Sequence, residues 1–144
     1  MTRWVVDASV AVKWFLPEVD AEAAQRLLQA QHELLAPDLL WAEVGNTLWK
    51  KWRQGEITAE TAQGILRDIR TFPLQVHRTE MLLETAWDLA VQWQRSIYDS
   101  LYLAIAMTVT CQLVTADRRF YNALRDHLAP TYLLWVADVP AAEG

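Results

Sequence analysis

At 144 residues, of which 53% are hydrophobic, the chain has the length and apolar content of one domain built around one core. No window of about eighteen uncharged apolar residues occurs, so we expect neither a signal peptide nor a membrane span. A single cysteine, Cys111, excludes an internal disulfide and a multi-thiolate zinc site, which favours a cytoplasmic protein with an inert, buried Cys111. The net charge of −5 disfavours an ordinary nucleic-acid binder, which neutralises phosphates with basic side chains.

The first half of the sequence alternates short apolar runs with amphipathic segments. In chain order it predicts strands at 4–6, 33–36 and 74–77 and helical segments at 10–16, 21–31, 38–55 and 58–71. In the 38–55 helix, Leu40, Val44 and Leu48 recur at every fourth residue and form an apolar face. Glu43 lies at the edge of this face.

The second half continues the alternation, with helices at 79–94, 98–109 and 118–125 and strands at 112–115 and 132–135. The 98–109 helix is apolar all round, so we expect it to be the central buried helix. The tail, 139–144, is expected to be frayed. Alternating strands and helices predict an α/β, three-layer α/β/α fold: one domain, 1–144, with a parallel sheet of four or five short strands.

Four acidic residues occupy positions that such a fold would bring together. Asp7 and Asp117 each follow a strand, at the sheet edge where the chemistry of parallel sheets gathers. Asp99 opens the buried helix, and Glu43 borders an apolar face. Taken singly, each acid is more simply explained as a helix cap or a surface residue. Together they would repel one another unless a cation were present.

All the donors in this set are oxygens, which hard ions such as Mg²⁺ or Mn²⁺ prefer over Zn²⁺. His32, His77 and His127 are too scattered to supply a competing site. The four acids also account for most of the net negative charge, so an acidic chain remains compatible with phosphate chemistry once divalent ions are bound.

Four segments of the sequence, 5–9, 43–48, 98–104 and 113–120, each contain one of these acids. They resemble the motifs of the PIN-domain nucleases, and in particular of the VapC-type toxins of prokaryotic toxin–antitoxin pairs. The resemblance runs from Val5 to about Tyr132, with the four acids in order. It implies that Asp7, Glu43, Asp99 and Asp117 are the catalytic acids and bind one or two divalent ions, Mg²⁺ or Mn²⁺.

Those ions would activate a water for in-line attack on an RNA phosphodiester bond, which makes the predicted enzyme an endoribonuclease. Ser9 and Thr115 match hydroxyl positions that organise the acidic site, although turn or cap hydroxyls explain them equally well. Asn46 lies one turn beyond Glu43 and is a candidate to orient that carboxylate or to contact the substrate. The candidates for contacts with RNA phosphates are Lys13, Arg118 and Arg119. Solvated surface positions explain these basic residues equally well.

The expected partners follow from the same resemblance: an RNA substrate, a cognate antitoxin that covers the acidic groove, and a second copy of the chain. The main alternative is a catalytically silent PIN-like module that binds RNA or protein, although such a module has no need of four mutually repelling acids. A phosphoryl-accepting receiver domain is a weaker alternative, because it needs a lysine near the fifth strand and none stands close to 132–134.

Overall fold

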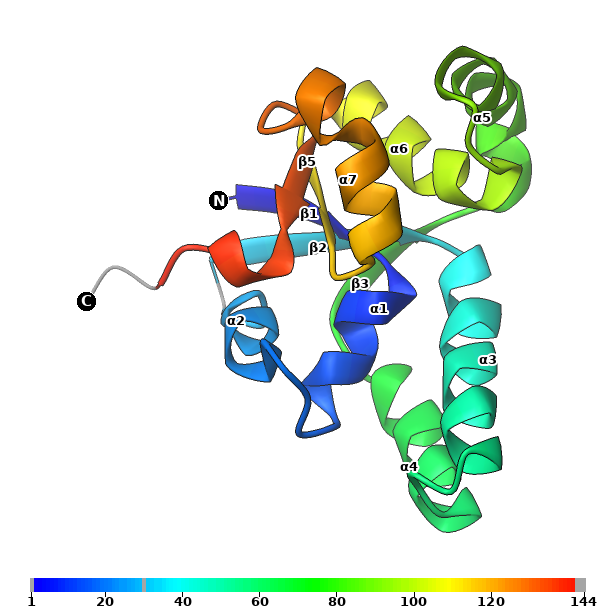
Figure 1. Ribbon diagram of the computed structural model, residues 1–144, viewed down its shortest axis with the longest axis vertical. Helices are drawn as coiled ribbons and strands as arrows, with labels where there is room; N and C mark the ends of the chain where they lie inside the picture. Colours follow the sequence, from blue (N-terminus) through cyan, green and yellow to red (C-terminus); the bar gives the residue numbers. More distant parts are fainter. Residues whose placement is uncertain (1, 30, 142–144) are drawn as a thin grey trace.

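The computed structural model shows a parallel sheet with helices on both sides (Figure 1). Its strands are the short apolar segments of the sequence, which have no polar face to turn towards water. The structure describes residues 2–29 and 31–141. The strands are β1 (Thr2–Val6), β2 (His32–Pro37), β3 (Leu74–His77), β4 (Gln112–Thr115) and β5 (Leu133–Trp135). The helices are α1 (Ala8–Ala11), α2 (Ala21–Arg26), α3 (Leu39–Arg53), α4 (Ala59–Ile69), α5 (Thr79–Trp93), α6 (Ile97–Val109) and α7 (Arg118–Leu128), with short 3₁₀ helices at Val12–Trp14 and Val136–Asp138.

The strand order is β3-β2-β1-β4-β5, and every neighbouring pair is parallel. The connections between parallel strands put α1 to α4, which connect β1 to β3, on one face of the sheet and α5 to α7 on the other (Figure 1). The predicted three-layer α/β/α fold is therefore confirmed. The strand order reverses between β1 and β4, and a crevice opens outside the carboxyl ends of strands at such a point.

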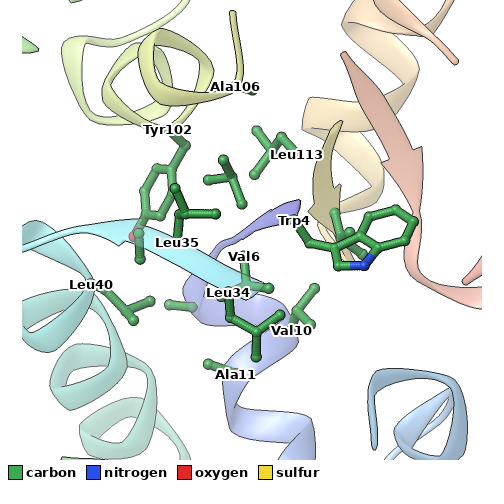
Figure 2. Close-up of a cluster of buried hydrophobic side chains, with 14 of the residues drawn as sticks. Trp4, Val6, Val10, Ala11, Leu34, Leu35, Leu40, Tyr102, Ala106 and Leu113 are labelled. Atoms are coloured by element: carbon green, nitrogen blue, oxygen red, sulfur yellow. The ribbon is translucent and has the colours of Figure 1, made fainter. Parts of the chain in front are cut away.

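The central strands are buried on both faces, which explains their continuous apolar sequences. Figure 2 shows Tyr102 and Ala106 of α6 on one side of β2, with Val10, Ala11 and Leu40 on the other. In α6, every residue from 100 to 106 is buried. The prediction that this helix lies at the centre of the molecule is confirmed, and its burial fixes the position of its first turn.

Several predicted boundaries differ from the structure, and three of these differences have a clear physical reason. The first helix begins at Ala8 rather than Val10, because the Asp7 side chain caps it. α2 ends at Arg26 rather than near Gln31, because the chain turns at Leu27 to enter β2. The last helix continues to Leu128, whose side chain is buried.

The prediction of a frayed tail is wrong at Val139, which is buried and whose carbonyl oxygen accepts a hydrogen bond of 2.8 Å from Arg26 Nη1. Residues 142–144 lie outside the described part.

Cys111 is half-buried, and burial raises the pKa of its thiol, which suits an unreactive residue. Within residues 2–29 and 31–141, no helix combines the length and apolarity that crossing a membrane requires.

Candidate active site

A pocket of about 530 Å³ lies at the carboxyl edge of β1 and β4, where the strand order reverses. Asp7 reaches it from the end of β1 and Asp117 from the loop after β4, while Glu43 comes from α3 and Asp99 from the first turn of α6. All four acids that the sequence was expected to bring together line this one pocket. Their roles as catalytic groups and metal ligands stay predictions.

Asp7 is the most firmly held of the four. Its Oδ1 accepts a hydrogen bond of 2.5 Å from Ser9 Oγ, and its Oδ2 accepts one of 2.5 Å from Thr115 Oγ1. Each hydroxyl in turn accepts a backbone N–H: Ser9 from Ala116 at 3.0 Å, and Thr115 from Asp117 at 3.1 Å. The two predicted hydroxyl residues therefore tie the end of β1 to the loop that follows β4.

The same position makes the charge on Asp7 costly. Burial raises the pKa of Asp7 from its ordinary value of 3.8 to about 6. The hydrogen bonds from Ser9 and Thr115 oppose this rise, and the charge of Asp117 adds to it. Near neutral pH, any cation that approaches this half-buried carboxylate therefore stabilises its charge.

Glu43 is held across the pocket by a residue that the sequence analysis did not single out. The Tyr102 hydroxyl of α6 donates a hydrogen bond of 2.5 Å to Glu43 Oε1. Burial raises the pKa of Glu43, and the nearby charge of Asp99 raises it further. Burial and the Glu43 charge also raise the pKa of Tyr102, which keeps the phenol protonated as a donor. The spacing of Tyr102 three residues after Asp99, on one helical face, was the available signal.

Asp99 has a basic partner that was also missed. Arg95 Nη2 donates to Asp99 Oδ2 at 3.2 Å, and Ser96 caps α6 by accepting the Asp99 backbone N–H. Burial raises the pKa of Asp99, Arg95 opposes the rise, and Asp117 adds to it. The four-residue spacing of Arg95 and Asp99 was visible in the sequence.

Asp117 is the most exposed of the four acids, and its Oδ1 caps α7 by accepting the Phe120 backbone N–H at 3.2 Å. The pKa effects connect the set, since the charge of Asp117 acts on Asp7 and Asp99, and that of Asp99 acts on Glu43. All four carboxylates therefore belong to one electrostatic cluster.

The remaining predicted residues are placed less uniformly. Asn46 lines the pocket, together with Lys50 one turn later, which the prediction did not include. Lys13 is engaged elsewhere, since its Nζ donates to the Val19 carbonyl oxygen at 2.7 Å. Arg118 lies over the Trp135 ring at 3.9 Å, and Arg119 is exposed. Neither arginine is among the described residues that line the pocket, so their RNA contacts stay predictions.

The donor set suits a hard divalent ion. Within the described ranges, no three His, Cys, Asp or Glu side chains form a preformed metal cage. Magnesium seldom needs one, because it usually keeps several waters and takes only one or two carboxylates. Here the side chains are oxygen donors, and three of the four acids have raised pKa values that a nearby cation would lower. The residues around the pocket therefore fit Mg²⁺ or Mn²⁺.

The sequence profile of the PIN domain matches residues 4–125, which contain all four acids. The chain belongs to the PIN domain family. Among curated PIN-type relatives, it is 35% identical over 119 residues to "Ribonuclease VapC3" of Pyrobaculum aerophilum, covering 81% of this chain and 91% of that protein. The resemblance predicted from the four motifs is confirmed.

Two solved structures share this PIN fold. PAE2754 from Pyrobaculum aerophilum superposes with a TM-score of 0.66 at 22% identity, covering 94% of this chain and 84% of that one. A chain of a toxin–antitoxin complex from Klebsiella pneumoniae superposes with a TM-score of 0.56 at 17% identity, covering 90% and 94%. At these identities the two likenesses establish the fold.

Proposed function

We propose that this PIN-domain protein is a VapC-type endoribonuclease that hydrolyses RNA phosphodiester bonds with one or two divalent ions, Mg²⁺ or Mn²⁺. The observation that carries the proposal is the single pocket lined by Asp7, Glu43, Asp99 and Asp117, which come from four separate segments. Repulsion among four acids costs folding free energy, and a metal-dependent reaction at a phosphate gives them a use. The identity to a relative named ribonuclease supports the choice of RNA as substrate.

The chain's own residues divide the work in this proposal. Asp7, Asp99, Asp117 and Glu43 would hold the metal, whose chemistry is Lewis-acid activation of the attacking water and stabilisation of charge at the phosphate. Ser9 and Thr115 keep Asp7 fixed by one hydrogen bond to each of its oxygens. Tyr102 does the same for Glu43 from the opposite wall. Lys50, at the pocket, offers a positive charge to a phosphate of the substrate.

Cleavage of RNA by the purified protein tests the proposal. We expect cleavage of a mixed RNA substrate in Mg²⁺ or Mn²⁺, no cleavage in excess EDTA, and recovery when the metal is returned. Asp99→Asn should abolish cleavage, whereas Asp126→Asn should not, because Asp126 is an 87% exposed acid outside the pocket.

Metal binding separates the proposed nuclease from a silent PIN-like module. Calorimetry with millimolar Mn²⁺ should detect binding to the wild type and weaker binding to Asp99→Asn. A protein that bound no divalent ion and cut no RNA would be the silent module instead.

We further propose that the chain is the toxin of a type II toxin–antitoxin system, acts in the cytoplasm and forms a homodimer. The fold shared with a chain of a toxin–antitoxin complex supports an antitoxin partner. An exposed apolar stripe on α5, formed by Leu83, Trp87 and Val91, supports the homodimer. Co-expression with a small protein encoded next to the gene should relieve growth arrest caused by the wild type, and Asp99→Asn alone should cause no arrest.

A further inference from the structure

The guanidinium of Arg95 forms an ion pair with one of the four pocket carboxylates, Asp99. Among the described residues, Arg95 is the basic residue whose ion pair reaches one of these acids, with Nη2 3.2 Å from Asp99 Oδ2. Asp99 lines the pocket and Arg95 does not. The positive charge therefore approaches Asp99 from outside the pocket lining and leaves the space beside the other acids free.

Two contacts fix the position of this guanidinium. It lies over the Phe120 ring of α7, 5.6 Å from the ring centre, and the Arg95 side chain is only 26% exposed. Phe120 lines the pocket, and its backbone N–H donates to Asp117 Oδ1. Arg95 therefore contacts both the helix that carries Asp99 and the helix that Asp117 caps.

The backbone before Arg95 holds it at this junction. Gln94 caps the carboxyl end of α5 in the left-handed region, with a φ of 56° that residues other than glycine rarely adopt. Ser96 then caps α6. Arg95 is thus the single residue between a sharp helix end and the cap of the helix that presents Asp99.

Stability alone does not account for an arginine here. Its Nε is buried and has no hydrogen-bond partner among the described residues. A buried donor without a partner destabilises the fold, and an apolar side chain packed on Phe120 would avoid that cost. What arginine adds is a fixed positive charge beside Asp99 Oδ2. The other oxygen, Asp99 Oδ1, accepts no hydrogen bond within residues 2–29 and 31–141.

We propose that Arg95 is a positioning residue for Asp99, whose guanidinium holds Oδ2 so that Oδ1 is presented to the pocket as a ligand for the divalent ion. This inference rests on the proposed function only in assuming that the pocket binds such an ion. Partners that orient metal-binding carboxylates affect the metal affinity although they never touch the metal.

Three variants test the role of Arg95. Arg95→Leu removes the charge and keeps an apolar contact with Phe120, and Arg95→Lys keeps the charge but loses the planar fork. Arg125→Leu is the control, because Arg125 belongs to an exposed ion pair with Asp126 on α7. Calorimetry measures the Mn²⁺ affinity of each metal-free protein, thermal unfolding measures its stability, and RNA cleavage gives kcat and KM.

For Arg95→Leu we expect Mn²⁺ affinity to fall by about 10- to 100-fold, the range for partners that orient metal ligands. We expect kcat to fall, KM for RNA to stay unchanged, and the unfolding temperature to stay close to that of the wild type. Arg95→Lys should recover part of the affinity, and Arg125→Leu should match the wild type throughout.

Other results overturn the inference. Unchanged or tighter Mn²⁺ binding by Arg95→Leu would mean that the guanidinium does not position the ligand, or mainly repels the ion. A higher KM with unchanged kcat would make Arg95 an RNA-binding residue. A wild type that binds Mn²⁺ but cuts no RNA would refute the nuclease proposal alone, and the affinities would still decide the role of Arg95. A wild type that binds no divalent ion would refute both.

Discussion

At the scale of single residues, the pocket holds carboxylates at positions where burial disfavours their charged form. Asp7 is half-buried and accepts hydrogen bonds from two hydroxyls, yet its neighbours Asp117 and Asp99 are acids as well. A core of the same size without this charge would be more stable, so the cost points to a function that needs the carboxylate. A substitution at Asp7 should therefore change stability and activity in opposite directions.

Replacing Asp7 by Asn should stabilise the metal-free protein at pH 7.5 and abolish RNA cleavage. The pKa of Asp7 is raised from 3.8 to about 6, so the folded state holds this proton more tightly than the unfolded state does. The stability from the proton is complete below pH 4 and is lost as the pH rises through 6. At about 1.4 kcal/mol per pKa unit, the wild type loses up to about 3 kcal/mol that Asn keeps.

Urea unfolding in EDTA at several pH values between 4 and 7.5 measures this difference. The gain in unfolding free energy for Asp7→Asn should be about 1–3 kcal/mol at pH 7.5, less than the full value because the amide cannot satisfy both hydroxyls as the carboxylate does. The gain should vanish near pH 4, where Asp7 of the wild type is protonated. Asp126→Asn should follow the wild type at every pH. An equal difference between Asp7→Asn and wild type at both ends of the range would show that the pKa of Asp7 is not raised.

Which single residues the sequence reveals depends on whether their partners are local. The four acids stand out because each occupies a conspicuous place, such as a strand end or the start of a buried helix. Tyr102 does not, because its importance lies in a contact with Glu43 on another helix. Arg95 has a local partner in Asp99, but its packing on Phe120 of α7 is not visible in the sequence. Such contacts follow from packing between elements, which periodicity alone does not specify.

At the scale of elements, helix capping and site formation use the same side chains. Asp7 caps α1 and Asp117 caps α7, while both line the pocket. The sequence left capping and catalysis open as alternatives for these acids, and the structure shows that a cap position and a pocket position coincide. A helix start directly after a strand is what directs these carboxylates to the edge of the sheet.

A pair of substitutions at Asp117 separates the two roles. Asn caps a helix about as well as Asp, whereas Ala does not, and losing a cap costs about 1 kcal/mol. Both variants lose the charge, so both should lose RNA cleavage. Only Asp117→Ala should unfold about 1 kcal/mol more easily than Asp117→Asn in urea, measured without metal. Equal stability of the two variants would show that the hydrogen bond to Phe120 contributes nothing to α7.

The element boundaries were predictable wherever apolar periodicity and caps agree. Thr58, the first residue of the predicted 58–71 helix, caps α4, and β3 and β4 have their predicted bounds. The start of α1 was missed because Asp7-Ala8-Ser9 also has the composition of a turn. The early end of α2 was missed because buried Leu27 belongs to the turn into β2, a constraint set by the sheet rather than by helix propensity.

At the scale of the whole molecule, the strand order accounts for the position of the pocket. Alternating strands and helices predicted a parallel sheet, but the order β3-β2-β1-β4-β5 follows from pairing between distant segments. Because the order reverses between β1 and β4, the helices that follow these strands diverge to opposite faces and leave a crevice. Asp7 and Asp117 lie at its base, which is why the charge of Asp117 raises the pKa of Asp7, 110 positions away in the sequence.

The same arrangement leaves α5 at the edge of the molecule, packed mainly on α6 (Figure 1). Leu83, Trp87 and Val91 are spaced four residues apart along it and are 45%, 64% and 58% exposed. Leu83 and Val91 lie at equal distances from Trp87, so two antiparallel copies of α5 would pair Leu83 with Val91 and Trp87 with itself. A two-fold symmetric dimer requires such a self-complementary surface.

Trp87→Glu should therefore convert the proposed dimer into a monomer. A charge at the centre of an apolar interface is buried without a partner in both copies, which costs several kcal/mol per dimer. Light scattering after gel filtration at micromolar concentrations should give twice the chain mass for the wild type and one chain mass for Trp87→Glu. Val19→Glu is the control, since Val19 is 80% exposed in the loop before α2 and should leave the dimer intact. A wild type with the mass of one chain, or a Trp87→Glu variant that stays dimeric, would exclude α5 as the dimer surface.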